Sequence, residues 1–406
     1  MRCLALDMGS TWTKAAYLDD AQVIRESRLP IPSPLLVGGE RYEVDATAYF
    51  DQVLALLKGL DAPDAEGLLI STQMHGCILT DEDFRPVTPY ISWRDGLGRK
   101  HLAEIIRRLG KEAAQPSGVL MKANLALCAL LGRGIEGERL PQGARFCTLG
   151  GYLIGRLTGE HVCHMTNAAP SGLADICNGG WNHPLIRAAG LDSLRFPRIV
   201  TGLEPVGKWG GVAVYADWGD QQACAAGASL TPEKTLHISV GTAGLMGVLT
   251  NAWEVGAWEN RPWLTPGMYL RTVSGLPGGR HMAGLEALLR AAVRDISGQE
   301  PAAGAVWEYL KHPQEAVQAR DLWDILSRPA PQMLGAYYAA FADAYAKAAA
   351  CLGFLPENVA FSGGAVSQNP ALRQSVCQAL GCTARAGEYD VWRGMLRLME
   401  QIHEQS

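Results

Sequence analysis

The chain contains two copies of one local pattern, and this repetition is the feature that most restricts its fold. An apolar run, a turn rich in glycine and threonine, and a second apolar run occur at residues 4–17 and again at 235–249. Each copy predicts a β-hairpin. When Gly9 is aligned with Gly241, Asp7 falls opposite Ser239, so only the first copy has the carboxylate. One hairpin near the start of each half predicts a duplicated chain that binds phosphates between its halves.

The first turn carries groups suited to a phosphate and a cation. Gly9 lets backbone N–H groups approach an anion closely. The hydroxyl donors beside it are Ser10, Thr11 and Thr13. Lys14 adds a positive charge, and Asp7 ends a buried strand, where a carboxylate can hold Mg²⁺ through water. The alternative is an ordinary hairpin with a polar turn. The spacing excludes a P-loop and a dinucleotide-binding fingerprint.

Composition limits the class of protein and its partners. A length of 406 residues favours two domains, and 48% hydrophobic residues with 46 glycines is typical of an α/β protein. A net charge of -5 gives no reason to expect nucleic acid or an anionic membrane as a partner. The ten cysteines form no CxxC pair, and no apolar run is long enough to cross a bilayer. We therefore expect a cytoplasmic protein, a monomer or homodimer, with small-molecule ligands.

A polar loop follows the predicted buried strand at residues 67–71. Gln73 and His75 offer hydrogen bonds to a polyhydroxylated ligand, and Met74 offers an adaptable apolar wall. Loops at strand ends are common ligand sites in α/β proteins. The alternative is a buried turn with a satisfied histidine.

A second polar loop contains Trp93 and Asp95. An aromatic ring can cover the C–H face of a sugar while a carboxylate accepts hydrogen bonds from its hydroxyls. The alternative is a loop whose tryptophan is simply packed. This loop and the preceding one are candidate sugar-binding segments.

The second half has its own candidates. Leu203 to Gly211 is rich in proline and glycine, so we place the domain boundary there, giving domains 1–208 and 209–406. Asp220 follows a predicted strand and begins a small-residue helix, where it can face a cleft or merely cap the helix. The pair Gly363 and Gly364 ends a short strand, where a flat adenine ring could lie against the backbone. The alternative is a plain strand-to-helix turn.

These segments, taken in order, resemble the FGGY carbohydrate kinases of the sugar kinase/Hsp70/actin superfamily over nearly the whole chain. The matching segments are Asp7-Met8-Gly9-Ser10-Thr11 with Lys14, Gln73-Met74-His75-Gly76, Trp93-Arg94-Asp95, Leu157-Thr158-Gly159, Thr166-Asn167-Ala168-Ala169, Gly219-Asp220-Gln221-Gln222-Ala223, Ile238-Ser239-Val240-Gly241-Thr242, and Ser362-Gly363-Gly364 with Asn369-Pro370. Within the family they are most similar to ketose kinases of the sedoheptulokinase and xylulokinase types.

The resemblance implies two actin-like (ribonuclease H-like) domains around a central cleft, with the sugar mainly on the first domain and ATP mainly on the second. It implies ATP-dependent phosphorylation of a terminal ketose hydroxyl, with Asp220 as general base and Asp7 and Asp220 at Mg²⁺. The implied sugar-site residues are Gln73, Met74, His75, Trp93, Asp95, Asp220 and Gln221. The implied ATP-site residues are Gly9, Ser10, Thr11, Thr13, Lys14, Gly241, Thr242, Gly363 and Gly364.

Two departures from the family pattern concern the sugar and the nucleotide. Leu97 stands where the family often has the arginine of Trp-x-Asp-x-Arg, and Trp392 and Arg393 stand where it usually has small residues. A kinase for xylulose or another polyol, and a non-catalytic sugar or nucleotide sensor on the same fold, are the alternatives.

Overall fold

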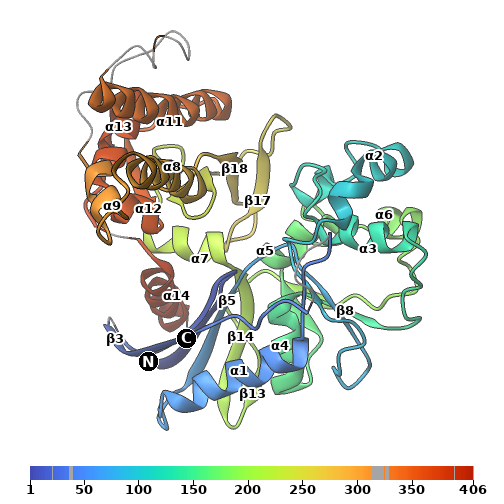
Figure 1. Ribbon diagram of the computed structural model, residues 1–406. Helices are drawn as coiled ribbons and strands as arrows, with labels where there is room; N and C mark the ends of the chain where they lie inside the picture. Colours follow the sequence, from blue (N-terminus) through green and yellow to red (C-terminus); the bar gives the residue numbers. More distant parts are fainter. Residues whose placement is uncertain (21, 36–39, 313–323, 325–328, 388, 406) are drawn as a thin grey trace.

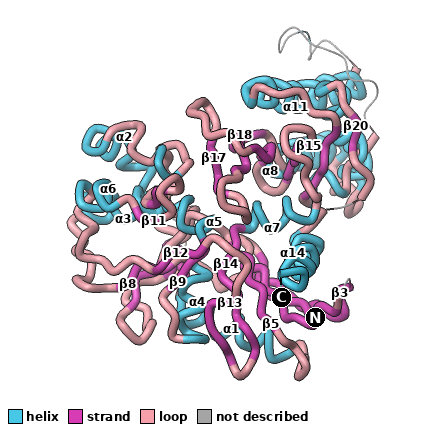
Figure 2. Tube along the Cα trace, turned by 180° about the vertical axis from the view of Figure 1, so that it is seen from behind, coloured by secondary structure: helices cyan, strands magenta, loops and turns pink. Residues whose placement is uncertain are grey.

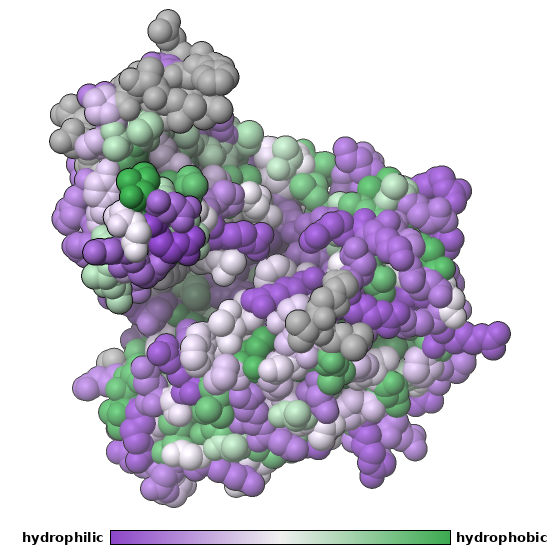
Figure 3. Space-filling view, viewed as in Figure 1, coloured by the Kyte–Doolittle hydropathy of each residue, from purple (hydrophilic) through white to green (hydrophobic). Residues whose placement is uncertain are grey.

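The computed structural model describes residues 1–406 except 21, 36–39, 313–323, 325–328, 388 and 406. Two six-stranded sheets form its framework, each in a lobe of its own (Figure 1). The space-filling view shows a hollow on one face between the lobe of the second sheet and the rest of the molecule (Figure 3). The predicted α/β fold with two actin-like domains and a cleft is confirmed.

The first sheet combines an antiparallel hairpin region with parallel strands. Its order is β13 (Pro205–Trp209), β14 (Val212–Gly219), β5 (Gly67–Thr72), β1 (Arg2–Met8), β2 (Trp12–Asp19) and β3 (Gln22–Pro30). Strands β1, β5 and β14 are parallel, whereas β1, β2 and β3 are antiparallel. The three parallel strands therefore end at one edge of the sheet.

The second sheet repeats this plan. Its order is β17 (Glu259–Pro262), β18 (Tyr269–Leu276), β16 (Gly244–Thr250), β15 (Thr235–Val240), β19 (Asn358–Ser362) and β20 (Thr383–Ala384). Strands β15, β16 and β18 are antiparallel neighbours, and β19 and β20 lie parallel to β15. Gly9 and Gly241 occupy the turns of corresponding hairpins. The predicted duplication is confirmed.

The helices and the shorter strands complete the two lobes. The helices are α1 (Ala46–Gly59), α2 (Leu97–Leu109), η1 (Gln115–Ser117), α3 (Ala126–Ile135), α4 (Leu149–Thr158), α5 (Met165–Ala168), η2 (Ala169–Ser171), α6 (His183–Ala188), α7 (Asp220–Gly227), α8 (Gly279–Ser297), α9 (Ala305–Leu310), α11 (Ala330–Leu352), α12 (Gly364–Ser367), α13 (Pro370–Leu380) and α14 (Val391–Gln405). In the described part of the chain, two-stranded sheets pair β4 (Glu43–Val44) with β7 (Tyr90–Ile91), β6 (Ile78–Thr80) with β8 (Arg145–Cys147), β9 (Val162–His164) with β12 (Arg198–Val200), and β10 (Ala174–Asp175) with β11 (Gly180–Trp181).

Both faces of the first sheet are covered, which explains why its central strands read as continuous apolar runs. Leu4 and Leu6 of β1 pack with α1 and α4 on one face. Cys3 and Ala5 point to the other face and pack with α7 and α14. No described helix is both long and apolar enough to span a bilayer.

Helix α7 lies between the two sheets. Ala223 and Ala226 contact the core of the first sheet, while Ala225 and Ala228, just past its end, contact residues of the second. Small side chains are required here because a bulky helix face would hold the two sheets apart. The residue that begins α7, Asp220, is therefore placed where the lobes meet (Figure 1).

The chain returns to its first sheet at the far end of the sequence. Helix α14 packs against α7 and β1, and the two views place it beside the strands near the labelled ends of the chain (Figures 1 and 2). The predicted boundary at residues 208/209 falls inside β13, and β14 continues the first sheet to Gly219. The division into domains 1–208 and 209–406 stays a prediction, since the first lobe also uses residues from beyond residue 209.

Candidate active site

Three parallel strands bring several of the predicted site residues to one edge of the first sheet. Ser71 of β5 lies between Asp7 of β1 on one side and Trp218 of β14 on the other. Asp7, one residue before the end of β1, thus lies level with the ends of β5 and β14. The residues that follow β5 and β14, Gln73 and Asp220, emerge at the same edge.

Asp7 lies in a buried, partly compensated position. Its carboxylate accepts a hydrogen bond from Ser71 Oγ at 3.3 Å and lies 3.5 Å from Lys14 Nζ. Burial raises the pKa of Asp7, and Lys14 opposes that rise. A carboxylate that is only weakly bound by protein donors is available to a cation.

Asp220 is the first residue of α7 and is partly buried. Gly219, not Asp220, is the N-cap, and Asp220 Oδ1 accepts from the backbone N–H of Gln221 at 2.8 Å. Burial, together with the charge of Asp7, raises the pKa of Asp220 to about 7. The two carboxylates share one region because β1 and β14 end at the same edge of the sheet. A pKa near 7 suits a group that must accept a proton at neutral pH.

A buried hydrogen-bond network fixes the end of β14. The Asp217 carboxylate accepts from Thr148 Oγ1 at 2.8 Å and from Asn167 Nδ2 at 3.0 Å. Thr166 Oγ1 accepts from the backbone N–H of Gly219 at 3.0 Å. Thr166 and Asn167 belong to α5, which continues directly into η2, and this short helical segment holds the end of β14 and thereby Asp220 in place.

Gln73 and Met74 connect the sheet edge to its neighbours. Gln73 is buried, and its Nε2 donates to Gly9 O in the first hairpin turn at 3.1 Å. The Met74 side chain lies so close to Gly219 that an added Cβ there would be 2.7 Å from Sδ. Gln73 therefore braces the hairpin turn, and Met74 forms the wall beside the start of α7.

His75 has an unusual backbone and a defined ring orientation. Its φ of 72° lies in the left-handed region, which is rare for a non-glycine residue and common at functional sites. Its Nδ1 is 2.9 Å from Pro170 O. Because a carbonyl can only accept, Nδ1 carries the proton. Burial and the charges of Lys122 and Arg261 hold the pKa of His75 well below its usual range. The neutral ring therefore leaves Nε2 as an acceptor for a ligand hydroxyl.

Trp93 lies on a segment that runs beside the segment of His75. An antiparallel bridge joins Cys77 to Ile91, so His75 and Trp93 extend to the same side of it. Gly76 permits this contact, because a Cβ there would meet the Tyr90 ring at 2.5 Å. The Trp93 ring is half-buried and has the Arg94 guanidinium near its face.

The carboxylate of Asp95 is fully hydrogen-bonded to other groups of the protein. Its two oxygens accept from the backbone N–H groups of Tyr42 and Leu97 at 3.1 Å each and from both terminal nitrogens of Arg133. A carboxylate accepts about four hydrogen bonds, so this one is saturated. The structure thus shows Asp95 anchoring the Trp93 loop; its direct contact with a sugar stays a prediction.

A cluster of three charged side chains, Lys122, Glu259 and Arg261, adjoins these residues and was not predicted from the sequence. Glu259 accepts two hydrogen bonds from Arg261, and its Oε1 lies 2.5 Å from Lys122 Nζ. Arg261 also donates to Gln221 Oε1, while Gln221 Nε2 donates to Thr272 at 3.1 Å. Lys122 belongs to the first lobe and Glu259 to the second sheet. Isolated charges in a loop and an edge strand give no periodic signal, so sequence could not reveal this cluster.

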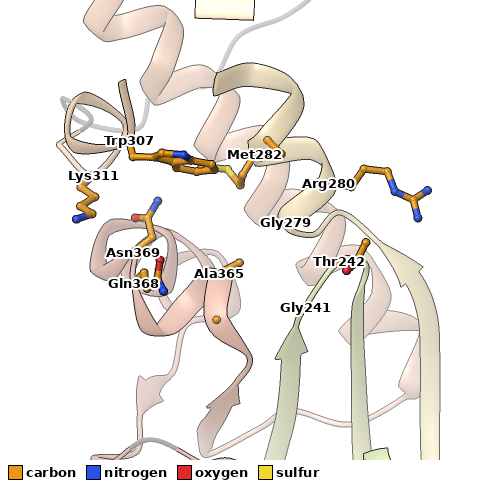
Figure 4. Close-up of a pocket in the computed structure, with 12 residues that line it drawn as sticks. Gly241, Thr242, Gly279, Arg280, Met282, Trp307, Lys311, Ala365, Gln368 and Asn369 are labelled. Carbon is orange, nitrogen blue, oxygen red and sulfur yellow. The ribbon is translucent and has the colours of Figure 1, made fainter. Parts of the chain in front are cut away.

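A separate cavity of about 600 Å³ lies in the second lobe (Figure 4). Gly241 and Thr242 border it at one end, and Gly364 and Ala365 border it on the side of α12. Gly363, at φ 95°, lies beside Val240, whose backbone would meet an added Cβ at 2.6 Å. The cavity therefore brings together Gly241, Thr242 and Gly364, whereas Gly363 shapes the turn behind it.

The opposite wall of the cavity was not predicted. Trp307 and Met282 lie side by side above the space, facing Ala365 and Gln368 (Figure 4). Trp307 is 39% exposed, which leaves its ring available to a flat ligand. It belongs to α9, in a segment whose sequence shows no clear periodicity.

The hydroxyl side chains of the first hairpin turn do not all face the same way, although the sequence groups them as one anion site. Ser10 and Thr11 lie at its tip, with Thr11 exposed. Thr13 is buried, and its hydroxyl donates to Tyr49 OH at 3.4 Å. Ser10 and Thr11 are therefore available to an anion, and Thr13 faces the interior.

Among the described residues, no group of three or more His, Cys, Asp and Glu side chains is arranged to hold a metal ion alone. Mg²⁺ commonly takes one or two carboxylates and completes its shell with water and substrate phosphates. Asp7 and Asp220 fit that mode of binding.

The profile of the FGGY family of carbohydrate kinases, N-terminal domain, matches residues 2–223. This range includes Asp7, the Gln73–His75 loop and Asp220. The chain belongs to the FGGY family of carbohydrate kinases.

Curated relatives support this membership. The FGGY chain is 25% identical over 259 residues to xylulose kinase of Escherichia coli (strain K12), a match covering 60% of this chain and 53% of the relative. It is 26% identical over 365 residues to glycerol kinase of Trichlorobacter lovleyi, covering 82% of this chain and 68% of the relative. The chain spans about half the length of the xylulose kinases that it matches.

Solved structures share the fold of this FGGY chain. A ligand-bound xylulose kinase from Lactobacillus acidophilus superposes with a TM-score of 0.83 at 17% identity, covering 100% of this chain and 90% of that one. A gluconate kinase from the same species gives 0.85 at 15% identity with the same coverage.

Proposed function

We propose that the chain transfers the γ-phosphoryl group of ATP to a terminal hydroxyl of a ketose, with xylulose and sedoheptulose, or a similar sugar or polyol, as first candidates. The observation that carries the proposal is the meeting of Asp7 and Asp220 at one sheet edge, beside a neutral His75. Xylulose kinase and glycerol kinase are the names of its relatives, which favours an acceptor of this chemical class. A cytoplasmic location, as the sequence suggests, is part of the proposal.

In the proposed reaction Asp220 accepts the proton of the attacking hydroxyl. The oxygen of that hydroxyl then bonds to the γ-phosphorus as the bond to the β-phosphate oxygen breaks, and ADP leaves. Such transfer depends mainly on positioning and on neutralising charge. Bound Mg²⁺ supplies charge neutralisation at the phosphates. Asp7 and Asp220 are its proposed protein ligands.

The sugar is proposed to lie between His75 and Asp220. His75 Nε2 accepts from one sugar hydroxyl, Met74 and Trp93 cover apolar faces, and Gln221 fixes the start of α7. Gln73 acts through Gly9 by holding the hairpin turn. Asp95 holds the Trp93 loop, and its direct contact with the sugar stays part of the proposal.

The nucleotide is proposed to occupy the cavity of the second lobe. The base lies between Trp307 and the Gly364–Ala365 backbone, and Gly241 and Thr242 lie toward the phosphates. Gly9, Ser10, Thr11 and Lys14 of the first hairpin contribute from the opposite lobe, and Thr13 and Gly363 shape the two turns from behind.

The test is ADP release from Mg-ATP across ketoses, aldoses and polyols, compared with a control without acceptor. We expect one acceptor to raise ADP release well above the control. Asp220→Asn should lower kcat for that acceptor by about 10²–10⁴-fold while acceptor and nucleotide binding, measured by calorimetry, persist. Binding of nucleotide without acceptor-dependent turnover on the whole panel would favour the sensor, and normal turnover by Asp220→Asn would refute the assignment of the base.

A further inference from the structure

The charged cluster of Lys122, Glu259 and Arg261 lies on the acceptor side of the candidate site. The position of each member follows from its contacts. His75 bonds to Pro170 in η2, and β17, which carries Glu259 and Arg261, packs against η2. The loop that leads to Lys122 also touches β17, since a Cβ on Gly118 would lie 2.1 Å from Asn260 O.

The charges of this cluster do not cancel. Lys122 and Arg261 supply two positive charges, and Glu259 supplies one negative charge, so one positive charge is left over. The two cations together keep Glu259 ionised, with its pKa lowered to about 2 despite burial. Among the ion pairs of the described residues, Asp220 pairs with neither cation within 4.0 Å, although the charge of Arg261 partly opposes the rise in the pKa of Asp220.

Donors in the cluster also remain available. The Lys122 ammonium has three N–H groups, and within the described part of the chain Glu259 is its ion-pair partner. Its side chain is 26% exposed and therefore not fully enclosed by the protein. Burial lowers the pKa of Lys122, which shows that its charge is held at a cost in desolvation. The N–H groups of Lys122 that Glu259 does not use are available to an anionic ligand.

We infer that the acceptor is a sugar acid, whose carboxylate binds Lys122 while its far terminal hydroxyl reaches Asp220; Arg261, held by Glu259 and Gln221, adds positive charge behind this contact. This inference rests on the proposed kinase function and changes the favoured acceptor from a neutral sugar or polyol to a polyhydroxy or keto acid. A carboxylate carries one negative charge and matches the one uncompensated positive charge. A phosphate monoester carries nearly two, so a sugar phosphate is the poorer match.

A neutral ketose would not use this arrangement. Hydroxyl groups can be bound by neutral acceptors and donors, which His75 and the backbone already provide. A charged hydrogen bond is roughly twice as strong as a neutral one, so the cluster discriminates strongly in favour of an anion.

The test compares acceptors that differ only in the group at C1. The pairs are 2-ketogluconate with fructose, gluconate with glucitol, and xylonate with xylitol, with fructose 1-phosphate as the phosphate probe. ADP release with Mg-ATP gives kcat/KM for each. We expect the acid of at least one pair to exceed its neutral partner by about 10- to 100-fold.

Variants assign that preference to Lys122. Lys122→Met removes the charge with little change in length and should reduce the acid-to-neutral ratio about tenfold or more, whereas Lys122→Arg should retain most of it. The matched control is Lys100→Met, which removes another lysine paired with a glutamate, at 2.6 Å from Glu136, but on the outer surface of α2. The control should leave the ratio unchanged.

The outcomes separate the inference from the function on which it rests. Turnover of neutral members equal to or better than that of acids would overturn the inference and leave the kinase proposal standing. Preference for the phosphate probe would overturn the carboxylate assignment. Nucleotide binding without turnover of any acceptor would refute the kinase proposal and the inference with it. The wild-type panel decides these points even if Lys122→Met is unstable.

Discussion

Asp220 shows how one residue can serve two physical purposes. It begins α7, where a negative charge interacts favourably with the helix dipole, and its position between the lobes removes much of its water. The second effect dominates, because the pKa rises to about 7. The residue is thus poised to change protonation near neutral pH.

Activity should depend on the protonation of Asp220. Because only the ionised carboxylate can accept the hydroxyl proton, kcat/KM should fall about tenfold per pH unit below about pH 7 and level off above it. The measurement is a pH–rate profile with the best acceptor at saturating Mg-ATP. A profile flat from pH 5 to 8 would contradict the role of Asp220.

The same shift predicts an effect on stability. The folded pKa lies above the unfolded value of 3.8, so the carboxyl contributes stability at low pH that is lost as pH rises toward 7. Asp220→Asn should therefore have a Tm close to that of the wild type at pH 4 and higher by on the order of 2 °C at pH 8. Thermal unfolding at both values, with Asp83→Asn as an exposed control, checks the sign.

At the scale of elements, the packing of α7 against α14 sets the geometry of the site. A Cβ on Gly394 of α14 would lie 1.7 Å from Ala223 O of α7, so the two helices cross almost backbone to backbone. The short side chains of α7 allow it to fit between the sheets and against α14 at once. A shift of this crossing would move Asp220.

Gly394→Ala should test this close approach. Overpacking of a tight contact costs about 1–3 kcal/mol, and the displaced α7 should also lower kcat. Gly134→Ala, at an exposed helical glycine with open space around it, is the matched control and should gain about 0.5–1 kcal/mol. Denaturant unfolding of both variants measures the difference, and equal effects would contradict the crossing described here.

Helix α9 carries Trp307, whose proposed stacking on the nucleotide base can also be tested. Trp307→Ala should raise the Kd for ATP about tenfold through loss of stacking, whereas Trp307→Phe should stay within about threefold of the wild type. Calorimetric titration with a non-hydrolysable ATP analogue checks both. Unchanged affinity in Trp307→Ala would place the base elsewhere.

Site residues at the ends of strands could be predicted from the sequence, whereas site residues joined only by tertiary contacts could not. Asp7, Gln73 and Asp220 could be placed because each lies at or shortly after the end of a predicted strand, and the ends of parallel strands meet at one edge of a sheet. The cluster of Lys122, Glu259 and Arg261 could not be placed, since it joins a loop to an edge strand through tertiary contacts. Trp307 could not be predicted as a cavity residue either, because α9 is short and its sequence lacks periodicity. The hydrogen bonds between Asp95 and Arg133 could not be predicted, because the two residues are 38 positions apart in the sequence.

For the whole molecule, the first lobe is completed by the last helix. Val391, Trp392, Met395, Leu398, Met399 and Ile402 of α14 are buried in one cluster with Cys3, Ala5 and Leu18 of the first sheet. Trp392 Nε1 also donates to Glu26 Oε2 at 2.9 Å. The departure from the family pattern at Trp392 thus fills the core of the first lobe.

Residues 1–229 alone should fail to fold. Without α14, six buried apolar side chains are missing, which removes on the order of 10 kcal/mol of burial. We expect this fragment to aggregate, and the same fragment joined through a Gly/Ser linker to residues 391–405 to be soluble with a cooperative thermal transition. A soluble, cooperatively folded 1–229 fragment would contradict this dependence.

The return of α14 to the first sheet has a consequence for biosynthesis. At about 5–20 residues per second, a ribosome needs about 9–36 s to translate the residues between the end of α7 and the end of α14. During that interval the nascent first lobe presents an uncovered apolar face, centred on Cys3, Ala5 and Leu18. Chaperones that bind emerging chains should therefore recognise this face until residues 391–402 leave the ribosome.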